Sequence, residues 1–363
     1  MATKGYHSYR GRRTGRRGLL IGLLVLILLL ACAFLFSLRY VTYDDDGSLR
    51  LDLPFLRKEE TAAPDGAPQE DEEDGQDVNL VISDPQPAQP QEPEEEPYGE
   101  HRLLELAALP ADGAELGAEL AQQGANGFVY TVRDNTGQVF YSSTAAISTA
   151  VAAGAASGEA LSALCRQEDV LSVARINCFH DSYYAWANME SAGICQPTGY
   201  IWYDNLSYHW LDPAKKAARD YVIGLALECA QMGFDELLLE EMCYPSSGKL
   251  EKIDYSGNTV GKAEALEQFL TELRQALEPY DVRVCLLLDQ RLLSAEGGGD
   301  YAEESGQELE RLLPLVDAVY ARTEDAAAAE SVLAAAAGEA EAPPLVPVVS
   351  EAGTDGSWYV SAR

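Results

Sequence analysis

The sequence predicts an α/β protein whose folded part is a (β/α)8 barrel of the TIM type. After residue 100, short apolar runs alternate with stretches of helical periodicity, which is typical of successive β-strand and α-helix units. Eight such units occupy about 260 residues, close to the usual size of this barrel. The alternative is an open doubly wound sheet, but no glycine-rich phosphate-binding turn follows any strand.

Composition excludes one class of partner. The 363 residues carry a formal net charge of -33 and an isoelectric point near 4.3. Such a charge repels phosphate backbones, so we expect no nucleic-acid partner. It also argues against attachment to a membrane through surface charge alone.

Residues 18–38 connect the chain to a membrane in another way. They are uncharged and mostly apolar, and their number is what a helix needs to cross a hydrocarbon core of about 30 Å. Basic residues stay on the cytoplasmic side, so we expect residues 1–17 to be a cytoplasmic tail and the later chain to be extracytoplasmic. The flanking charges are Lys4, Arg10, Arg12, Arg13, Arg16 and Arg17 before the segment and Asp44, Asp45 and Asp46 after it.

Two cleaved forms of this segment are alternatives. Residues 31–33 resemble a signal-peptidase site, and residues 29–32 resemble a lipoprotein box. Either cut would fall inside an apolar run that continues through Phe36. We therefore predict an uncleaved signal anchor that makes a single pass through the cell membrane.

Residues 39–99 are predicted to be an acidic linker. From residue 58 onward they are rich in glutamate, aspartate, proline and glutamine and poor in apolar groups. Such a segment buries too little surface to offset the entropy of ordering it, so we expect disorder. The barrel is assigned to residues 100–363.

The strands and helices of the barrel follow from apolar periodicity and its boundaries. The helix after Asp212 is the best marked, with Asp212 as N-cap, Pro213 at the first position and Gly233 as the stop. Only a loop fits between the last two strands, so we expect closure there to be irregular. Strands are expected at 101–109, 126–132, 170–178, 234–240, 282–289, 315–320, 345–349 and 358–361, and other helices at 111–123, 157–167, 266–277, 303–313 and 326–337.

The predicted fourth strand ends in two adjacent carboxylates, Glu240 and Glu241. Side chains alternate along a strand, and Leu237 and Leu239 suit the helix layer. Glu240 is therefore expected to point to the barrel mouth, where active sites of this fold lie, and Glu241 to turn outward or into the following loop.

These residues also carry a resemblance. WLDP at 210–213, a helix, and GFDELLLEEMCYP at 233–245 are similar to a bacterial family of proposed glycoside hydrolases with a TIM-barrel-like domain, whose pattern runs W-x-D-P, helix, G-F-D-E-I-Q-F-D-Y-I-R-F-P. Residues 132–137 and 173–181 resemble that family's second and third strands. Its members are typically secreted or anchored by one N-terminal helix.

The resemblance places the family's suspected catalytic aspartate on Glu240. It places the family's tyrosine on Glu241, its arginine on Cys243 and its glutamine on Leu238. The carboxylate is thus kept, while much of its polar support is lost.

Glycoside hydrolysis needs two carboxyl groups on either side of the scissile bond. We expect Glu240 to be the acid/base, with Glu351, Asp134 or Asp181 as the second carboxylate. The alternative is structural: Glu240 and Glu241 would cap the barrel rim, paired with Arg175 or Arg291.

Aromatic side chains gather in the loop after the third strand. Flat rings with a polar edge suit sugar faces, and the alternative is that several plug the barrel or brace the next helix. Expected substrate-binding residues are Trp186, Trp202, Tyr203, His180 and Arg291. The loop's rings are Tyr183, Tyr184, Trp186, Tyr200, Trp202, Tyr203, Tyr208, His209 and Trp210.

No metal or other cofactor is expected. The four histidines form no HExxH motif, and the seven cysteines form no CxxC motif. Cys178 and Cys243 end neighbouring strands and are the pair most apt to meet, but no disulfide is assigned.

Two functions follow from the sequence. One is a membrane-anchored, extracytoplasmic glycoside hydrolase acting on cell-envelope or environmental polysaccharide by carboxylate acid/base catalysis. The other is a non-catalytic barrel that binds glycan or an envelope protein.

Overall fold

The computed structural model describes residues 41–43, 49–51, 98–294, 298–323 and 325–361, in two units, Met1–Pro90 and Gln91–Arg363. In the first, β1 (Val41–Tyr43) pairs antiparallel with β2 (Leu49–Leu51), within the predicted linker. No helix in the described part is long and apolar enough to cross a membrane. The predicted span at 18–38 lies outside the described residues.

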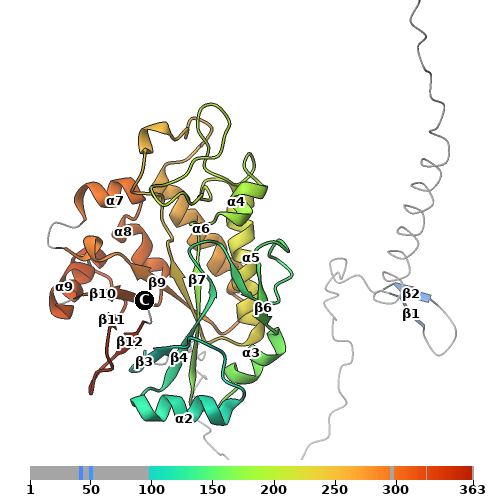
Figure 1. Ribbon diagram of the computed structural model, residues 1–363, viewed down its shortest axis with the longest axis vertical. Helices are drawn as coiled ribbons and strands as arrows, with labels where there is room; N and C mark the ends of the chain where they lie inside the picture. Colours follow the sequence, from blue (N-terminus) through green and yellow to red (C-terminus); the bar gives the residue numbers. More distant parts are fainter. Residues whose placement is uncertain (1–40, 44–48, 52–97, 295–297, 324, 362–363) are drawn as a thin grey trace, which may run out of the picture. The chain divides into compact units, whose positions relative to one another are not determined.

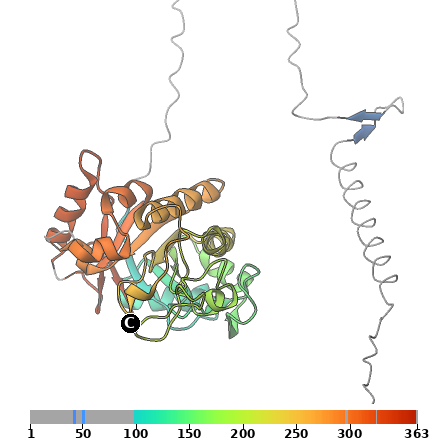
Figure 2. The same ribbon diagram turned by 90° about the horizontal axis from the view of Figure 1, so that it is seen from above.

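The second unit is a closed barrel of eight parallel strands, as predicted (Figures 1 and 2). Each strand pairs with the next, and the last pairs with the first. Two unpredicted strands, β5 (Val139–Tyr141) and β6 (Val151–Ala156), extend outward from β4. In ring order the barrel strands are β3 (Arg102–Glu105), β4 (Gly127–Arg133), β7 (Leu171–Asn177), β8 (Glu236–Glu240), β9 (Arg283–Leu288), β10 (Ala318–Arg322), β11 (Leu345–Val349) and β12 (Trp358–Val360).

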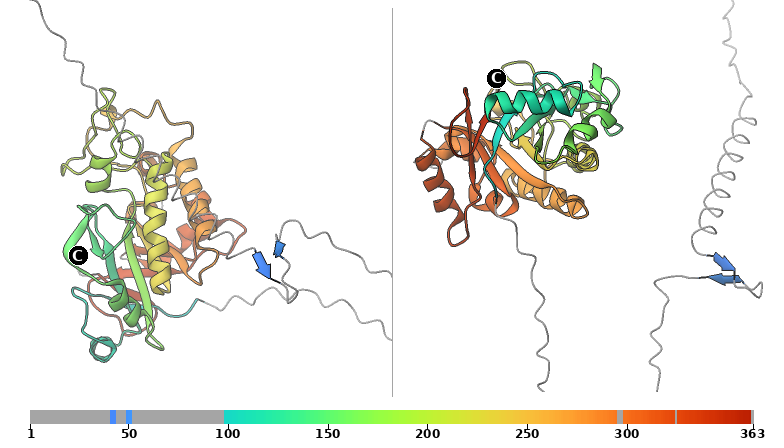
Figure 3. Two further views of the ribbon diagram at one scale, coloured as in Figure 1. Left: turned by 90° about the vertical axis from the view of Figure 1, so that its right-hand side faces the viewer. Right: turned by 90° about the horizontal axis from the view of Figure 1, so that it is seen from below.

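Helices surround the strands. The connection from β11 to β12 is a loop, as predicted, and the two strands share only a short ladder. Figure 3 shows α2, in teal, and α9, in dark red, on either side of these last strands. The helices are α2 (Gly113–Gln123), α3 (Gly158–Cys165), α4 (Tyr183–Ala187), α5 (Lys216–Met232), α6 (Lys262–Leu277), α7 (Gly299–Ser305), α8 (Leu309–Leu312) and α9 (Ala326–Ala337), with short 3-10 turns η2 (Leu250–Lys252), η3 (Gln290–Leu293) and η4 (Leu313–Leu315).

The start of α5 differs from the prediction. Gly233 ends the helix with φ 92°, as expected of a left-handed stop. The helix begins at Lys216, however, and Asp212 is not its N-cap. The carboxylate of Asp212 accepts hydrogen bonds from the Tyr244 hydroxyl at 3.1 Å and the Asn258 amide at 3.1 Å. The same carboxylate also accepts from the Ala214 backbone N–H at 3.1 Å, so Asp212 braces the turn before the helix and adds tertiary contacts.

The helix predicted at 303–313 is also different. It is divided into α7 and α8 at Gly306, which has φ 76°. A Cβ there would lie 2.8 Å from the Cβ of Lys262, so both the backbone conformation and the close approach of α6 require glycine. Pro314 then occupies η4, and β10 begins only at Ala318, later than the predicted 315.

The barrel interior is filled by side chains from all eight strands. On β8, Leu238 belongs to this inner core, whereas Leu237 and Leu239 pack in the outer core with the helices. The alternation predicted for this strand is confirmed. Burying each of these leucines contributes about 1.5–3 kcal/mol. The inner core consists of Leu103, Val129, Val173, Leu238, Cys285, Ala318, Tyr320, Val346, Val348 and Tyr359.

The floor of the barrel, at the start of β8, is polar. Glu236 is fully buried, with His101 Nε2 2.7 Å from its Oε1, and its Oε2 accepts hydrogen bonds from the hydroxyls of Tyr320 at 2.8 Å and Tyr98 at 3.2 Å. The ring of Tyr98 stacks on His101 with centroids 4.0 Å apart. Burial opposes ionisation of Glu236, but the hydrogen bonds from His101 and Tyr320 outweigh it and lower the carboxyl pKa.

Candidate functional site

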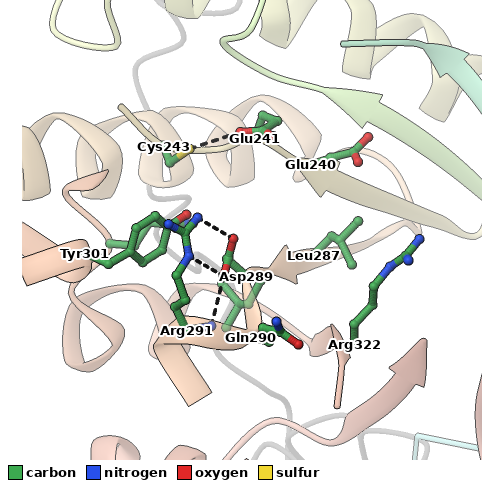
Figure 4. A pocket seen from close by; sticks show the side chains of 11 residues that line it. Glu240, Glu241, Cys243, Leu287, Asp289, Gln290, Arg291, Tyr301 and Arg322 are labelled. Atoms are coloured by element: carbon green, nitrogen blue, oxygen red, sulfur yellow. Dashed lines mark hydrogen bonds and ion pairs between the residues drawn. The ribbon is translucent and has the colours of Figure 1, made fainter. Parts of the chain in front are cut away.

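A cavity of about 350 Å³ lies where β8, β9 and β10 end (Figure 4). This is the carboxyl end of the barrel, where active sites of the fold are built. Figure 4 shows Glu240 and Glu241 on one side of the cavity and Asp289 with Arg291 on the other. The lining residues are Glu240, Glu241, Cys243, Leu287, Leu288, Asp289, Gln290, Arg291, Tyr301, Gln307 and Arg322.

Glu240, the last residue of β8, is held by Arg175 from the neighbouring strand β7. Arg175 Nε donates to Oε2 at 2.9 Å and Nη2 to Oε1 at 3.2 Å. Arg175 Nη1 also donates to Glu105 Oε1 at 2.9 Å and to the Tyr359 hydroxyl at 3.0 Å. This two-point contact favours the ionised carboxylate. The pairing with Arg175 considered as the structural alternative is therefore present.

Glu241 follows with an unusual backbone conformation. Its φ is 48°, in the left-handed region that residues other than glycine rarely adopt. Its carboxylate lines the cavity and accepts a contact from the Cys243 thiol at 3.4 Å. Burial raises the pKa of Glu241, and the charges of Glu240 and Asp289 add to the rise, against the opposing influence of His180 and the thiol.

The opposite wall is built by Asp289 and Arg291. Asp289 Oδ1 accepts hydrogen bonds from the backbone N–H and the Nε of Arg291, both at 2.9 Å, and Oδ2 accepts from Nη2 at 2.7 Å. The guanidinium lies 3.7 Å from the ring centroid of Tyr301. Burial opposes ionisation of Asp289, but the bonds from Arg291 lower its pKa. This wall therefore presents an ionised carboxylate and a fixed cation.

The other proposed carboxylates lie outside the cavity. Asp134 Oδ1 accepts from the backbone N–H groups of Thr136 at 2.9 Å and Gln138 at 3.0 Å and so shapes the turn after β4. Asp181 is buried and forms an ion pair with Arg133. It also accepts from the Tyr184 backbone N–H at 2.6 Å.

Glu351 is exposed in the loop between β11 and β12 and lines a separate hollow with Glu105 and Glu119. Of the sequence-based candidates, the structure brings Glu240 and Arg291 together. It adds Asp289 and Glu241, which the sequence reasoning had not chosen as partners. The position of Asp289 directly after a strand was the signal that could have identified it.

The aromatic loop between β7 and α5 contains both buried and exposed rings. Trp202 is buried and donates from Nε1 to the Lys249 carbonyl at 3.0 Å. Trp186 and Tyr203 are 60% and 56% exposed, and Trp186 stacks on His209 with centroids 5.3 Å apart. Among the candidate rings, Trp186 and Tyr203 reach solvent, whereas Trp202 packs within the loop.

His180 is a buried anchor of the same loop. Its ring stacks on Trp210 with centroids 4.4 Å apart, and its Nε2 lies 3.1 Å from Asp204 Oδ2. Burial opposes ionisation of Asp204, but hydrogen bonds from His180, the Tyr208 backbone and Trp210 lower its pKa to about 2.

Within the described ranges, no three or more histidine, cysteine, aspartate or glutamate side chains are grouped to hold a metal ion. Cys178 and Cys243 are both free thiols.

Comparisons with solved structures find matches at low identity and with TM-scores below 0.5. The glycoside hydrolase domain of PgaB (BpsB) from Bordetella bronchiseptica is 12% identical, with a TM-score of 0.48, over 72% of this chain and 94% of that one. The glycoside hydrolase domain of PelA from Pseudomonas aeruginosa is 15% identical, with a TM-score of 0.39, over 69% and 84%. A hypothetical protein from Ruminiclostridium thermocellum is 23% identical, with a TM-score of 0.40, over 47% and 88%.

Comparison of the sequence with family models identifies the family of this chain. No curated protein matches the chain. Residues 118–322 match the family described as "Putative glycosyl hydrolase domain". Because this match spans more than half of the 363 residues, the chain belongs to that family.

Proposed function

We propose that the protein is a glycoside hydrolase that cleaves polysaccharide at the cavity above β8, β9 and β10. The observation that carries this proposal is the gathering of Glu240, Glu241 and Asp289 in one cavity at the barrel's carboxyl end. Two carboxyl groups in different protonation states are what the reaction needs. Arg175 and Arg291 favour the ionised forms of Glu240 and Asp289, while burial favours the protonated form of Glu241.

The size and lining of the cavity suit a sugar unit. Its volume of about 350 Å³ is at the lower end of the range for small-ligand sites. Arg291, Gln290 and Gln307 supply polar groups around it that fit the hydroxyl groups of a sugar ring. Trp186 and Tyr203 offer exposed ring faces for neighbouring units of a polymer.

The location of the enzyme is part of the proposal. The apolar segment at 18–38, preceded by basic and followed by acidic residues, would anchor the chain in the cell membrane with its barrel outside. An extracytoplasmic barrel would meet cell-envelope or environmental polysaccharide, and we propose these as the substrate class.

The test is release of reducing sugar by the purified full-length chain from a panel of polysaccharides. We expect the wild type to act on at least one of them and Glu240→Gln to lose turnover by about 100-fold or more. Glu351→Gln is the matched control, because it removes an exposed carboxylate outside the cavity, and it should retain wild-type turnover.

A second function has one observation in its favour. Both oxygens of Glu240 are occupied by Arg175, which closes the barrel rim as a structural ion pair would. In a non-catalytic barrel that binds glycan or an envelope protein, Glu240 would serve only as the partner of Arg175 in this ion pair. Binding of a polysaccharide without release of sugar, unchanged in Glu240→Gln, would establish this second function and refute the first.

A further inference from the structure

Glu240 and Glu241 are consecutive residues whose side chains line the same cavity. From this we infer that Glu241 is the proton donor of the proposed reaction and Glu240 its ionised partner. The inference rests on the proposed function and assigns separate roles to two adjacent carboxylates. Neither role follows from residue type, because both are glutamates at the end of one strand.

The backbone explains how both side chains reach one cavity. In an extended strand, successive side chains point to opposite faces, and Glu240 follows the inward face of Leu238. At Glu241 the positive φ interrupts this alternation, so the second carboxylate also faces the cavity instead of the helix layer. A left-handed residue other than glycine costs about 1–2 kcal/mol.

Hydrogen bonds keep this conformation in place on both sides. The Glu240 carbonyl accepts from the Cys178 N–H at 2.8 Å, and the Tyr244 N–H donates to the Ser305 carbonyl at 2.8 Å. The other described non-glycine residues with positive φ, Asp169 and Ser207, are both exposed. Glu241 is the one of the three whose conformation places a titratable group in a cavity.

The surroundings of the two carboxylates differ in charge. Both oxygens of Glu240 accept hydrogen bonds from the guanidinium of Arg175, an arrangement that favours the carboxylate form, which has no proton to donate. Among the described residues, Glu241 has the Cys243 thiol as its hydrogen-bond partner and no arginine or lysine paired with it. Burial outweighs the opposing influence of His180 and favours the protonated acid, in agreement with the raised pKa of Glu241.

The proposed step is a hydrolysis. The bond between the anomeric carbon and the bridging oxygen breaks, and its electron pair stays on that oxygen, which takes the proton of Glu241. The ionised Glu240 stabilises the positive charge that develops on the anomeric carbon. Water then supplies hydroxide to this carbon, and its remaining proton returns to Glu241.

The first experiment compares substrates whose leaving groups differ in how much they need a proton. The probes are the polysaccharide that the wild type cleaves and two synthetic glycosides of the released sugar, one with a dinitrophenyl and one with a methyl leaving group. Full-length Glu241→Gln should lose about 100-fold or more on the polysaccharide and the methyl glycoside. On the dinitrophenyl glycoside, which leaves without a proton, it should stay within about tenfold of the wild type.

Glu240→Gln should lose activity on all three probes. The fall of kcat/KM on the alkaline side of the pH profile should also disappear in Glu241→Gln, because the acid that titrates there is gone. Wild-type activity of Glu241→Gln on the polysaccharide would overturn the inference. So would a loss in Glu240→Gln confined to the methyl glycoside and the polysaccharide.

A second measurement separates this inference from the proposed function. Infrared difference spectra recorded along a pH titration should show one carboxyl band that persists to higher pH than the bands of the other glutamates, missing in Glu241→Gln and present in Glu240→Gln. Absence of that band in the wild type overturns the assignment whatever the turnover. Presence of the band without turnover refutes the proposed function and supports the protonated state of Glu241.

Folding is checked with a matched variant. Glu241→Asn also removes the acid, and asparagine adopts the left-handed conformation more readily than glutamate. It should therefore unfold at the same denaturant concentration as the wild type or a higher one, yet share the leaving-group dependence of Glu241→Gln. Wild-type turnover of Glu241→Asn on the polysaccharide would also overturn the inference.

Discussion

Glu236 and Glu240 are the same residue type on the same face of one strand, at opposite ends of the barrel. At the floor, Glu236 is fully buried and contacts His101, Tyr320 and Tyr98. At the mouth, Glu240 is 22% exposed and borders a cavity. The surroundings, and not the residue type, thus make one carboxylate structural and the other available to a ligand.

The two ends differ because of what the chain places over them. The floor is closed by the segment that leads into β3, with Gly99 accepting a contact from His101 Nδ1 at 2.7 Å. The mouth is bordered by the loops after β8 and β9 and by the end of β10, which leave a hollow between them. Loops on a rigid scaffold are where binding groups are usually found.

The largest expected effect is on stability at the floor. Glu236→Gln should lower the free energy of unfolding by about 3–5 kcal/mol, because it leaves His101 without its charged partner in a buried site. Urea denaturation of the variant and the wild type measures this loss. Glu351→Gln, exposed in its loop, should change stability by less than about 0.5 kcal/mol. Equal losses in the two variants would remove the contrast between floor and surface.

The second prediction concerns Arg175 at the mouth, whose substitution should affect both stability and turnover. Arg175→Met should cost about 2–3 kcal/mol, less than Glu236→Gln because Glu240 is partly solvated, and should lower turnover at least tenfold. Arg175→Lys keeps the positive charge but loses the planar guanidinium that contacts both oxygens of Glu240. It should therefore be more stable than Arg175→Met and less stable than the wild type. A turnover unchanged in Arg175→Met would show that Arg175 only braces the rim.

A third prediction concerns a carboxylate near the mouth that is structural. Asp204 has its pKa lowered to about 2, so its stabilisation is fully present above the ordinary range of aspartate and is lost as pH falls through about 2. After allowance for solvent screening, this amounts to about 1–2 kcal/mol. Thermal or urea unfolding between about pH 5 and pH 2 should show a weaker pH dependence in Asp204→Asn. An unchanged dependence would assign the acid sensitivity to other groups.

The smallest effect on stability is expected at the outer edge of the mouth. Trp186 is 60% exposed, so Trp186→Ala should change the free energy of unfolding by less than about 0.5 kcal/mol. It should still weaken polysaccharide binding several-fold through loss of the ring face. Leu206→Ala, 71% exposed in the same loop but without a ring, should leave binding unchanged. Affinity electrophoresis on the polysaccharide compares the two variants.

Periodicity was enough to predict the barrel and the faces of β8. Leu237, Leu238 and Leu239 lie where the period of two places them. The predicted start of α5 was wrong because Asp212 holds a turn ahead of the helix through the Ala214 N–H and also binds Tyr244 and Asn258, which are distant in sequence. Of the two orientations predicted for Glu241, the structure shows the one toward the following loop, where its carboxylate contacts Cys243. Its place in the cavity was not predicted, because alternation ends where φ becomes positive.

The site was predictable only in part, for a physical reason. Glu240 and Arg291 could be placed at strand ends from the sequence. Asp134 and Asp181 are at strand ends as well, but nearby backbone N–H groups and Arg133 occupy their oxygens. Whether a carboxylate at a strand end is free to bind a ligand depends on contacts with other segments of the chain. The sequence of a single chain does not show these contacts.

The stacking of Tyr98 on His101 and its bond to Glu236 have a mechanical consequence. Any force along the chain ahead of Tyr98 enters the barrel at its closed end, through buried polar contacts. The length of the strands separates that point of load from the cavity at their other end. A pull on this segment would therefore load the floor of the barrel first, at the other end of the strands from the cavity, and Tyr98 joins the barrel's buried contacts two residues before the boundary predicted at residue 100.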